Sequence, residues 1–157
     1  MSLEKQIQQD IKAAMLAKEK TRLESLRGIK AAILLAKTAE GAVLAKDEAG
    51  NEALADDAIV KLIQKLVKQR KETAEIYKQQ GRPELAENEL SEASFMEVYL
   101  PKQLTDEEIT AELVKIIAQV GATSQKEMGK VMGVATKAMA GRADGKKIGE
   151  LVRKLLN

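Results

Sequence analysis

The stretch TDEEITAELVKIIAQVG, from Thr105 to Gly121, predicts an amphipathic α-helix with both ends marked. Thr105 and Glu108 have the spacing of a capping box, in which each side chain accepts a hydrogen bond from the backbone N–H of the other residue. Apolar residues then recur every three or four positions, which places them on one side of a helix. Gly121 suits the left-handed conformation that ends many helices. This segment must therefore bury one face against other helices.

Two further helices are expected downstream. Ser124 and Glu127 repeat the capping-box spacing before an apolar stripe that ends at Gly141. Asp144 is the expected N-cap of a last helix. Pro101 restricts the residue before it and marks a boundary. We expect residues 101–157 to form a small three-helix domain, near the lower size limit for an independent core.

Upstream, apolar residues at helical spacing predict two helices around residues 3–15 and 23–33. Thr21 and Glu24 form a further capping-box pair, so we expect the chain to break near Lys20 and to form a helical hairpin.

Residues 38–55 are weakly periodic and are expected to be a loop or a partly ordered segment. A third helix is expected to begin near Asp56 or Asp57 and to stop at Gly81, and a fourth to begin at Pro83. No run alternates apolar and polar residues as a strand does. The expected fold is all-α, with a helical hairpin or bundle over residues 1–100.

The composition of the 157 residues excludes most catalytic chemistry. The chain has no Cys, no His and no Trp, so it has no thiol nucleophile, no imidazole base and no Cys/His site for zinc, haem or an iron–sulfur cluster. Acidic runs such as Asp106–Glu108 fall in a first helical turn, where they complement the helix dipole. We therefore expect no catalytic residues, no metal and no cofactor.

Charge is unevenly distributed although the formal net charge is only +2. Residues 1–100 hold 16 Lys/Arg and 17 Asp/Glu, whereas from Lys115 onward there are 9 basic and 3 acidic residues. A basic C-terminal third favours an anionic partner such as RNA. The polar N-terminus and the absence of any run of about 18 apolar residues predict a soluble, cytoplasmic protein with no membrane segment.

The candidate phosphate-binding residues lie in the turn from Gly141 to Lys147. A turn that leads into a helix presents free N–H groups to an anion. An ordinary turn with solvated lysines is the alternative interpretation. The candidate nucleic-acid-binding residues are Arg142, Lys146 and Lys147 in this turn, with Lys130 and Lys137 before it.

Four glycines in this region need an explanation, and three of them, Gly129, Gly133 and Gly149, fall inside expected helices, where each costs about 1 kcal/mol relative to alanine. They allow either close packing of two helices of this chain or close approach of a partner's backbone. These glycines are Gly129, Gly133, Gly145 and Gly149.

Arg70 projects with Ile63 and Leu66 on the expected third helix, so its guanidinium must reach solvent or meet a carboxylate. Glu89 or Glu92 on the next helix is the expected partner. Lysines at 61, 65 and 68 instead form a stripe that is interpreted as a solvated face.

Several motifs together resemble the YqeY-like family over nearly the whole chain. They are KQRKETAEIY at 68–77, GRPELAENE at 81–89, YLPKQL at 99–104, GATS at 121–124, MGKVMG at 128–133 and GRADGK at 141–146. Residues 131–155 are most similar to the tail domain of the GatB subunit of the tRNA-dependent amidotransferase. The resemblance implies an all-helical fold in two parts and a tRNA-binding role. Carbon–nitrogen ligase activity with glutamine as amido-N-donor would be inherited only by analogy with the larger enzyme.

Two functions follow as hypotheses. The first is a non-catalytic tRNA-binding accessory that contacts RNA through its C-terminal unit. The second is a protein–protein interaction module that uses the Gly/Met-rich face of the C-terminal helices. Amidotransferase-type catalysis ranks behind both, because no catalytic group in the chain supports it.

Overall fold

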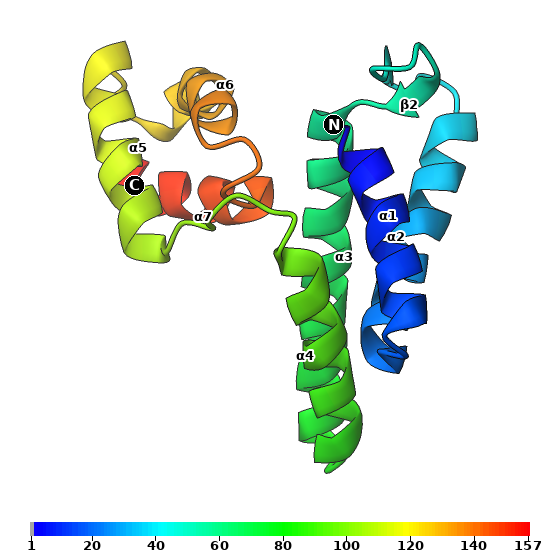
Figure 1. The fold of residues 1–157 in the computed structure, drawn as a ribbon. Coiled ribbons are helices and arrows are strands. Elements are labelled where there is room, and N and C mark those ends of the chain that lie inside the picture. The colour runs from blue at the N-terminus through cyan, green and yellow to red at the C-terminus, as the bar shows by residue number, and fades with distance from the viewer. Residues whose placement is uncertain (1) are drawn as a thin grey trace. The chain divides into compact units, whose positions relative to one another are not determined.

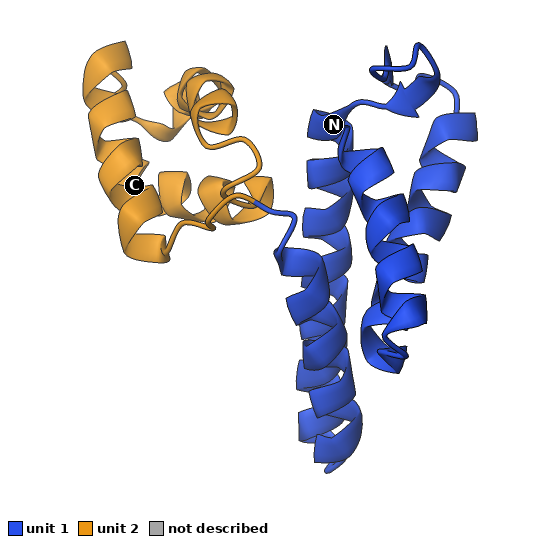
Figure 2. Cartoon of the chain, in the orientation of Figure 1, with its two compact units in different colours: residues 1–100 blue, residues 101–157 orange. Residues whose placement is uncertain are grey.

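The computed structural model describes residues 2–157, and these form seven α-helices with one small β-hairpin (Figure 1). Contacts divide the chain into two compact units, residues 1–100 and residues 101–157, which we call unit 1 and unit 2 (Figure 2). Each unit has its own hydrophobic core. The fold is mainly all-α, in agreement with the helical periodicity of the sequence.

Unit 1 begins with a helical hairpin of α1 (Leu3–Leu16) and α2 (Lys20–Thr38). The break near Lys20 is confirmed, but the expected Thr21/Glu24 capping box is wrong. Glu19 is the N-cap, without a side-chain cap bond, and Lys18 adopts the left-handed conformation at φ 56°. The amide of Glu19 donates to the carbonyl of Ala14 at 3.0 Å, which closes the end of α1 in a Schellman motif.

The segment expected to be a loop instead contains a β-hairpin. Strand β1 (Leu44–Lys46) pairs antiparallel with β2 (Glu52–Leu54), with Leu44 opposite Leu54. The turn between them is closed by Asp47, whose carboxylate accepts from the amides of Ala49 and Asn51 at 2.9 and 2.8 Å. Leu54 is buried, so the hairpin adds to the core of unit 1.

Helices α3 (Asp56–Gln79) and α4 (Pro83–Glu97) form the second half of unit 1. Gly81 joins them at φ 72°, as its position after the helix predicts. Ile59 and Ile63 of α3 are fully buried against α1, α2 and α4, with Met96 of α4 in the same core.

Arg70 bridges α3 to α4, as the sequence predicts. Its guanidinium lies 3.2 Å from Glu89 and also bonds Glu92, whose side chain is 10% exposed. Burial raises the pKa of Glu92 more strongly than the attraction of Arg70 lowers it. A Cβ built on Gly28 of α2 would lie 3.5 Å from Arg70, an ordinary van der Waals contact, so α2 passes close to this cluster.

Unit 2 contains α5 (Asp106–Val120), the 3₁₀ turn η1 (Gln125–Glu127), α6 (Met128–Ala138) and α7 (Gly145–Leu156). The Thr105/Glu108 capping box and the left-handed Gly121 are confirmed. The Ser124/Glu127 capping box is wrong, because the Ser124 side chain makes no cap bond. Glu127 instead accepts from the amide of Thr123 at 2.5 Å, a bond that lowers the pKa of its carboxyl.

Candidate nucleic-acid interface

Helix α6 has one buried side and one open side. Val131, Ala135 and Met139 follow one another at four-residue spacing, and all three are fully buried in the core of unit 2. The opposite side therefore faces solvent and is made of small residues and lysines. It carries Gly129, Lys130, Gly133, Thr136 and Lys137.

Positive charge gathers on this side, although Glu127, the residue before α6, interacts electrostatically with Lys130. Lys130 and Lys137 are exposed, and α6 contains no acidic residue. Lys126 in η1 precedes Lys130 by one helical turn and is also exposed. None of these three lysines forms an ion pair among residues 2–157. We call Lys126, Lys130 and Lys137 the α6 lysines, although Lys126 lies in η1 just before the helix.

The glycines of α6 do not pack against another helix. A Cβ built on Gly129 or Gly133 would meet no atom within 4 Å, so the expected close packing of two helices at these positions is wrong. Gly145, the first residue of α7, is equally open. Gly149 is buried, but its neighbours are the ends of two flexible side chains, Met128 at 3.8 Å and Met132 at 3.9 Å, rather than a backbone.

Arg142 lies in the turn before α7, whereas Lys146 and Lys147 lie in the first turn of that helix, and two of these three basic residues already have partners in unit 2. Arg142 donates to the carbonyl of Ala138 at 2.7 Å, where it caps the end of α6. Lys147 lies 3.1 Å from the carboxylate of Asp106, and this hydrogen bond raises the pKa of Lys147. Lys146 is exposed and forms no ion pair among the described residues.

This turn is held in place from the start of unit 2. The amide of Leu104 donates to the carbonyl of Arg142 at 2.8 Å, and the side-chain amide of Gln103 donates to the carbonyl of Gly141 at 2.8 Å. Gly141 itself has φ 77°, in the left-handed region. Arg142 and Lys147 thus support the architecture, and the remaining positive charge of this region lies on the α6 lysines and Lys146.

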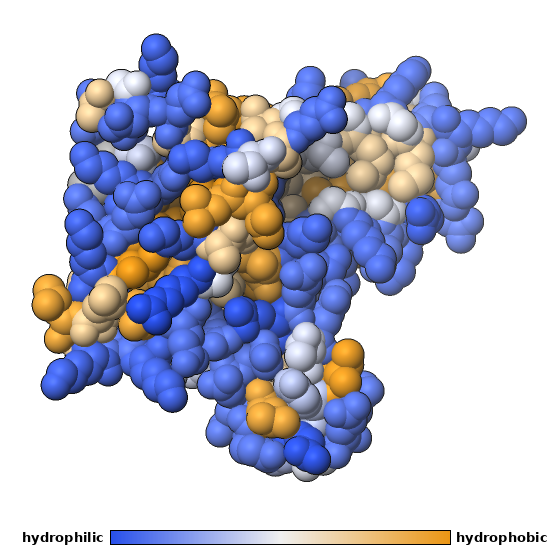
Figure 3. All heavy atoms as spheres, turned by 90° about the vertical axis from the view of Figure 1, so that its right-hand side faces the viewer, coloured by the Kyte–Doolittle hydropathy of each residue, from blue (hydrophilic) through white to orange (hydrophobic). Residues whose placement is uncertain are grey.

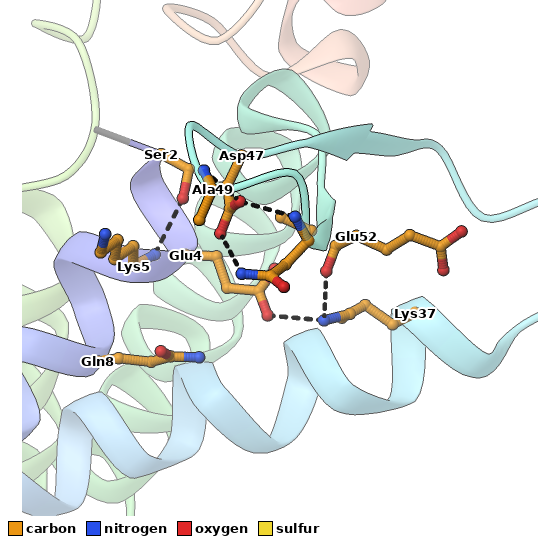
Figure 4. A pocket seen from close by; sticks show the side chains of 10 residues that line it. Ser2, Glu4, Lys5, Gln8, Lys37, Asp47, Ala49 and Glu52 are labelled. Carbon is orange, nitrogen blue, oxygen red and sulfur yellow. Dashed lines mark hydrogen bonds and ion pairs between the residues drawn. The ribbon is translucent and has the colours of Figure 1, made fainter.

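A concave feature lies in unit 1, and no pattern in the sequence points to it. A polar cleft of about 270 Å³ opens between α1, the end of α2 and the β-hairpin. Figure 4 shows Lys37 between the carboxylate of Glu4, at 2.9 Å, and the backbone carbonyl of Glu52, at 3.3 Å. The other oxygen of Glu4 accepts from the amide of Leu54 at 2.8 Å.

The charged groups deepest in this cleft serve the fold. Glu4 is 7% exposed and both of its oxygens are occupied, so the carboxylate anchors β2 to α1 and α2. No pattern in the sequence singles out Glu4, because an acidic residue in the first turn of a helix is ordinary. Its anchoring role follows only from its contacts in the folded structure.

The described residues form neither a metal site nor a membrane span. Among residues 2–157, no three His, Cys, Asp or Glu side chains cluster in a way that would hold a metal ion. None of the described helices combines the length and the apolar character that crossing a bilayer requires.

Comparison with known proteins gives the family. No curated protein matches the chain. The family model described as Yqey-like protein matches residues 4–156, which include nearly all of both units and the α6 lysines. The chain therefore belongs to the YqeY-like family.

Proposed function

We propose that the protein is a non-catalytic tRNA-binding module in which unit 2 contacts the phosphodiester backbone through the open side of α6. The observation that supports this most directly is the set of α6 lysines, which have no acidic neighbour on α6 and no ion-pair partner among the described residues. Lysines neutralise phosphates and release bound counterions, which is the main source of affinity for nucleic acids.

The glycines support the same surface. Gly129 and Gly133 leave the backbone of α6 uncovered beside Lys130 and Lys137, so a bulky polyanion can approach the helix axis more closely than it could with larger side chains. The helix cost of these glycines is not offset by any packing within unit 2. Contact with a partner would offset it.

Backbone recognition fits the chemistry of unit 2 better than base recognition. The only aromatic residues of the chain are Tyr77, Phe95 and Tyr99, and all three belong to unit 1. Single-stranded RNA is usually bound by stacking of its bases on aromatic rings, whereas structured RNA is bound through shape and phosphates. A folded RNA such as tRNA is therefore the proposed ligand.

The experiment is a titration of full-length protein against labelled tRNA at two salt concentrations. We expect affinity to fall as salt rises, and the triple variant Lys126→Glu, Lys130→Glu and Lys137→Glu to lose at least about tenfold in affinity at low salt. Reversal of Arg142, Lys146 and Lys147 is expected to weaken binding less, because two of these residues already have partners.

The matched control reverses three exposed lysines of α3, at positions 61, 65 and 78, and changes the net charge by the same amount. Equal losses in the control and the α6 variant would show only a general charge effect and would contradict the proposed surface. Absence of binding at low salt would defeat RNA binding altogether.

A protein partner on the same surface is the second candidate, favoured by the open glycines and by Val134, which is 41% exposed on α6. The methionines expected to contribute lie inside: Met139 is fully buried, and Met128 and Met132 pack against the core. Gly133→Leu distinguishes the two candidates in part. It keeps the charge, so it should weaken RNA binding less than the lysine reversals do.

A further inference from the structure

We propose that the outer face of α2 is a self-association surface on which two copies of the chain pair through antiparallel α2 helices. This surface lies in unit 1 and is independent of RNA binding by unit 2. It is formed by Glu24, Arg27, Ala31, Leu34 and Leu35, which share one side of α2 at three- and four-residue spacing and are all exposed.

Exposed apolar side chains lie near both ends of α2. Leu16, at the end of α1, is 86% exposed, and Leu35, near the end of α2, is 74% exposed. These are the two most exposed large apolar side chains among the described residues. Met15 and Leu34 accompany them at 52% and 54% exposure. Figure 3, which views the chain from the side of α1 and α2, shows apolar groups in separate places on an otherwise hydrophilic face.

Charges of both signs lie between the two apolar ends. Glu24 and Arg27 are exposed, and among residues 2–157 neither forms an ion pair. If two α2 helices run antiparallel about a two-fold axis between these residues, Glu24 of each copy faces Arg27 of the other. A parallel pair would instead place like charges opposite one another, which is unfavourable.

The same axis brings the apolar ends together. With a rise of 1.5 Å per residue, Leu34 and Leu35 lie about 13 Å from the axis along the helix. The turn between α1 and α2, with Met15 and Leu16, lies at the other end of α2. In the antiparallel pair each leucine end of one copy therefore meets the α1–α2 turn of the other. A surface that complements itself in this way is what a two-fold dimer requires.

The occupant inferred is a second copy rather than a different protein, because the chain supplies both halves of the match. The 19 residues of α2 make an interface of modest size, so the dimer should be weak and concentration-dependent.

The test is sedimentation of the full chain over roughly two orders of magnitude in protein concentration. We expect the weight-average mass to rise from 17.1 kDa toward twice that value. Leu35→Lys should hold the protein at the monomer mass, whereas Val114→Lys, at an exposed position of α5, should leave association unchanged.

A charge swap distinguishes this geometry from unspecific association. Glu24→Arg or Arg27→Glu alone should weaken dimerisation at least about fivefold, because each places two pairs of like charges together. The double variant restores the reciprocal pairs and should recover most of the loss. Circular dichroism of each variant shows whether it remains folded.

Three results would overturn the proposal. A monomer mass at all concentrations would show that another molecule, or none, covers this surface. Dimers that survive Leu35→Lys would place the interface elsewhere. Failure of the double variant to recover association would reject the antiparallel arrangement.

Discussion

Gly129 and Gly133 weaken α6 without a compensating contact inside unit 2. Alanine at either position places a methyl group where no atom lies within 4 Å and restricts the unfolded chain. We expect Gly129→Ala and Gly133→Ala each to raise the free energy of unfolding by about 0.5–1 kcal/mol. Urea denaturation followed by circular dichroism measures this.

Gly121 provides the contrasting substitution. Its φ of 69° lies in the left-handed region, so Gly121→Ala should lower the free energy of unfolding by about 1 kcal/mol although its surroundings are equally open. A loss of stability in Gly133→Ala would mean that the α6 backbone is already crowded, and would contradict both the packing described and the argument for an open side.

Single residues also show where local sequence signals mislead. Thr21 and Glu24 have the spacing of a capping box, yet the N-cap of α2 is Glu19, two residues before Thr21, and Lys18 makes the left-handed turn. The turn is set by the pair of bonds that close α1 and by packing of the helical hairpin. The Thr21/Glu24 spacing alone therefore does not decide where α2 begins.

Among the elements, the attachment of α4 to α3 depends on Arg70. Removing its charge leaves Glu89 and Glu92 side by side and largely buried, without a cation. We expect Arg70→Met to lower the free energy of unfolding by about 2–4 kcal/mol at neutral pH, measured by urea denaturation. Lys71→Met removes an exposed cation one residue away, which pairs with Glu97, and should cost less than about 1 kcal/mol.

The pH dependence of that loss has a definite sign. Burial raises the pKa of Glu92 in the folded protein above its unfolded value, and the loss of Arg70 raises it further. The folded state then binds the proton more tightly, so its stability falls as pH rises through the range above the unfolded pKa. The cost of Arg70→Met should therefore shrink as the pH is lowered toward about 4. A cost that does not change with pH would show that the lost interaction is packing and not charge.

The sequence predicts helices better than it predicts the β-hairpin. Helices α5 and α7 follow from periodicity within a few residues of each end. Strands β1 and β2 have three residues each, too few for alternation to appear, and neither contains a β-branched residue. They are held by Glu4, which lies 50 residues from its hydrogen-bond partner Leu54. The turn residues Asp47, Gly50 and Asn51 give the local signal of this hairpin.

Over the whole molecule, the two cores share no residue, so each unit should fold by itself. We expect a protein of residues 101–157 to give a helical circular dichroism spectrum and a cooperative thermal transition. Leu113 is fully buried in its core, and Leu113→Ala should lower its stability by about 2–4 kcal/mol. A disordered spectrum for the unsubstituted fragment would show that unit 2 depends on unit 1.

The candidate interface could be predicted only in part. The sequence places basic charge in residues 115–157, and two of the α6 lysines, Lys130 and Lys137, do lie on one side of a helix. It does not reveal that Arg142 and Lys147 are engaged by Ala138 and Asp106, because those partners are set by the turn of the backbone and by the fold of unit 2. The net charge of a segment can be counted from its sequence. The contacts that engage each charged side chain depend instead on its neighbours in the folded structure.

All aromatic side chains of the protein lie on one side of the boundary at Leu100. Tyr77, Phe95 and Tyr99 all belong to unit 1, so unit 2 is silent in near-ultraviolet absorption and in intrinsic fluorescence. Tyrosine emission therefore follows the unfolding of unit 1 alone, while far-ultraviolet dichroism follows both units. A single tryptophan placed in unit 2 would give that unit an optical signal of its own, because the chain contains no other tryptophan.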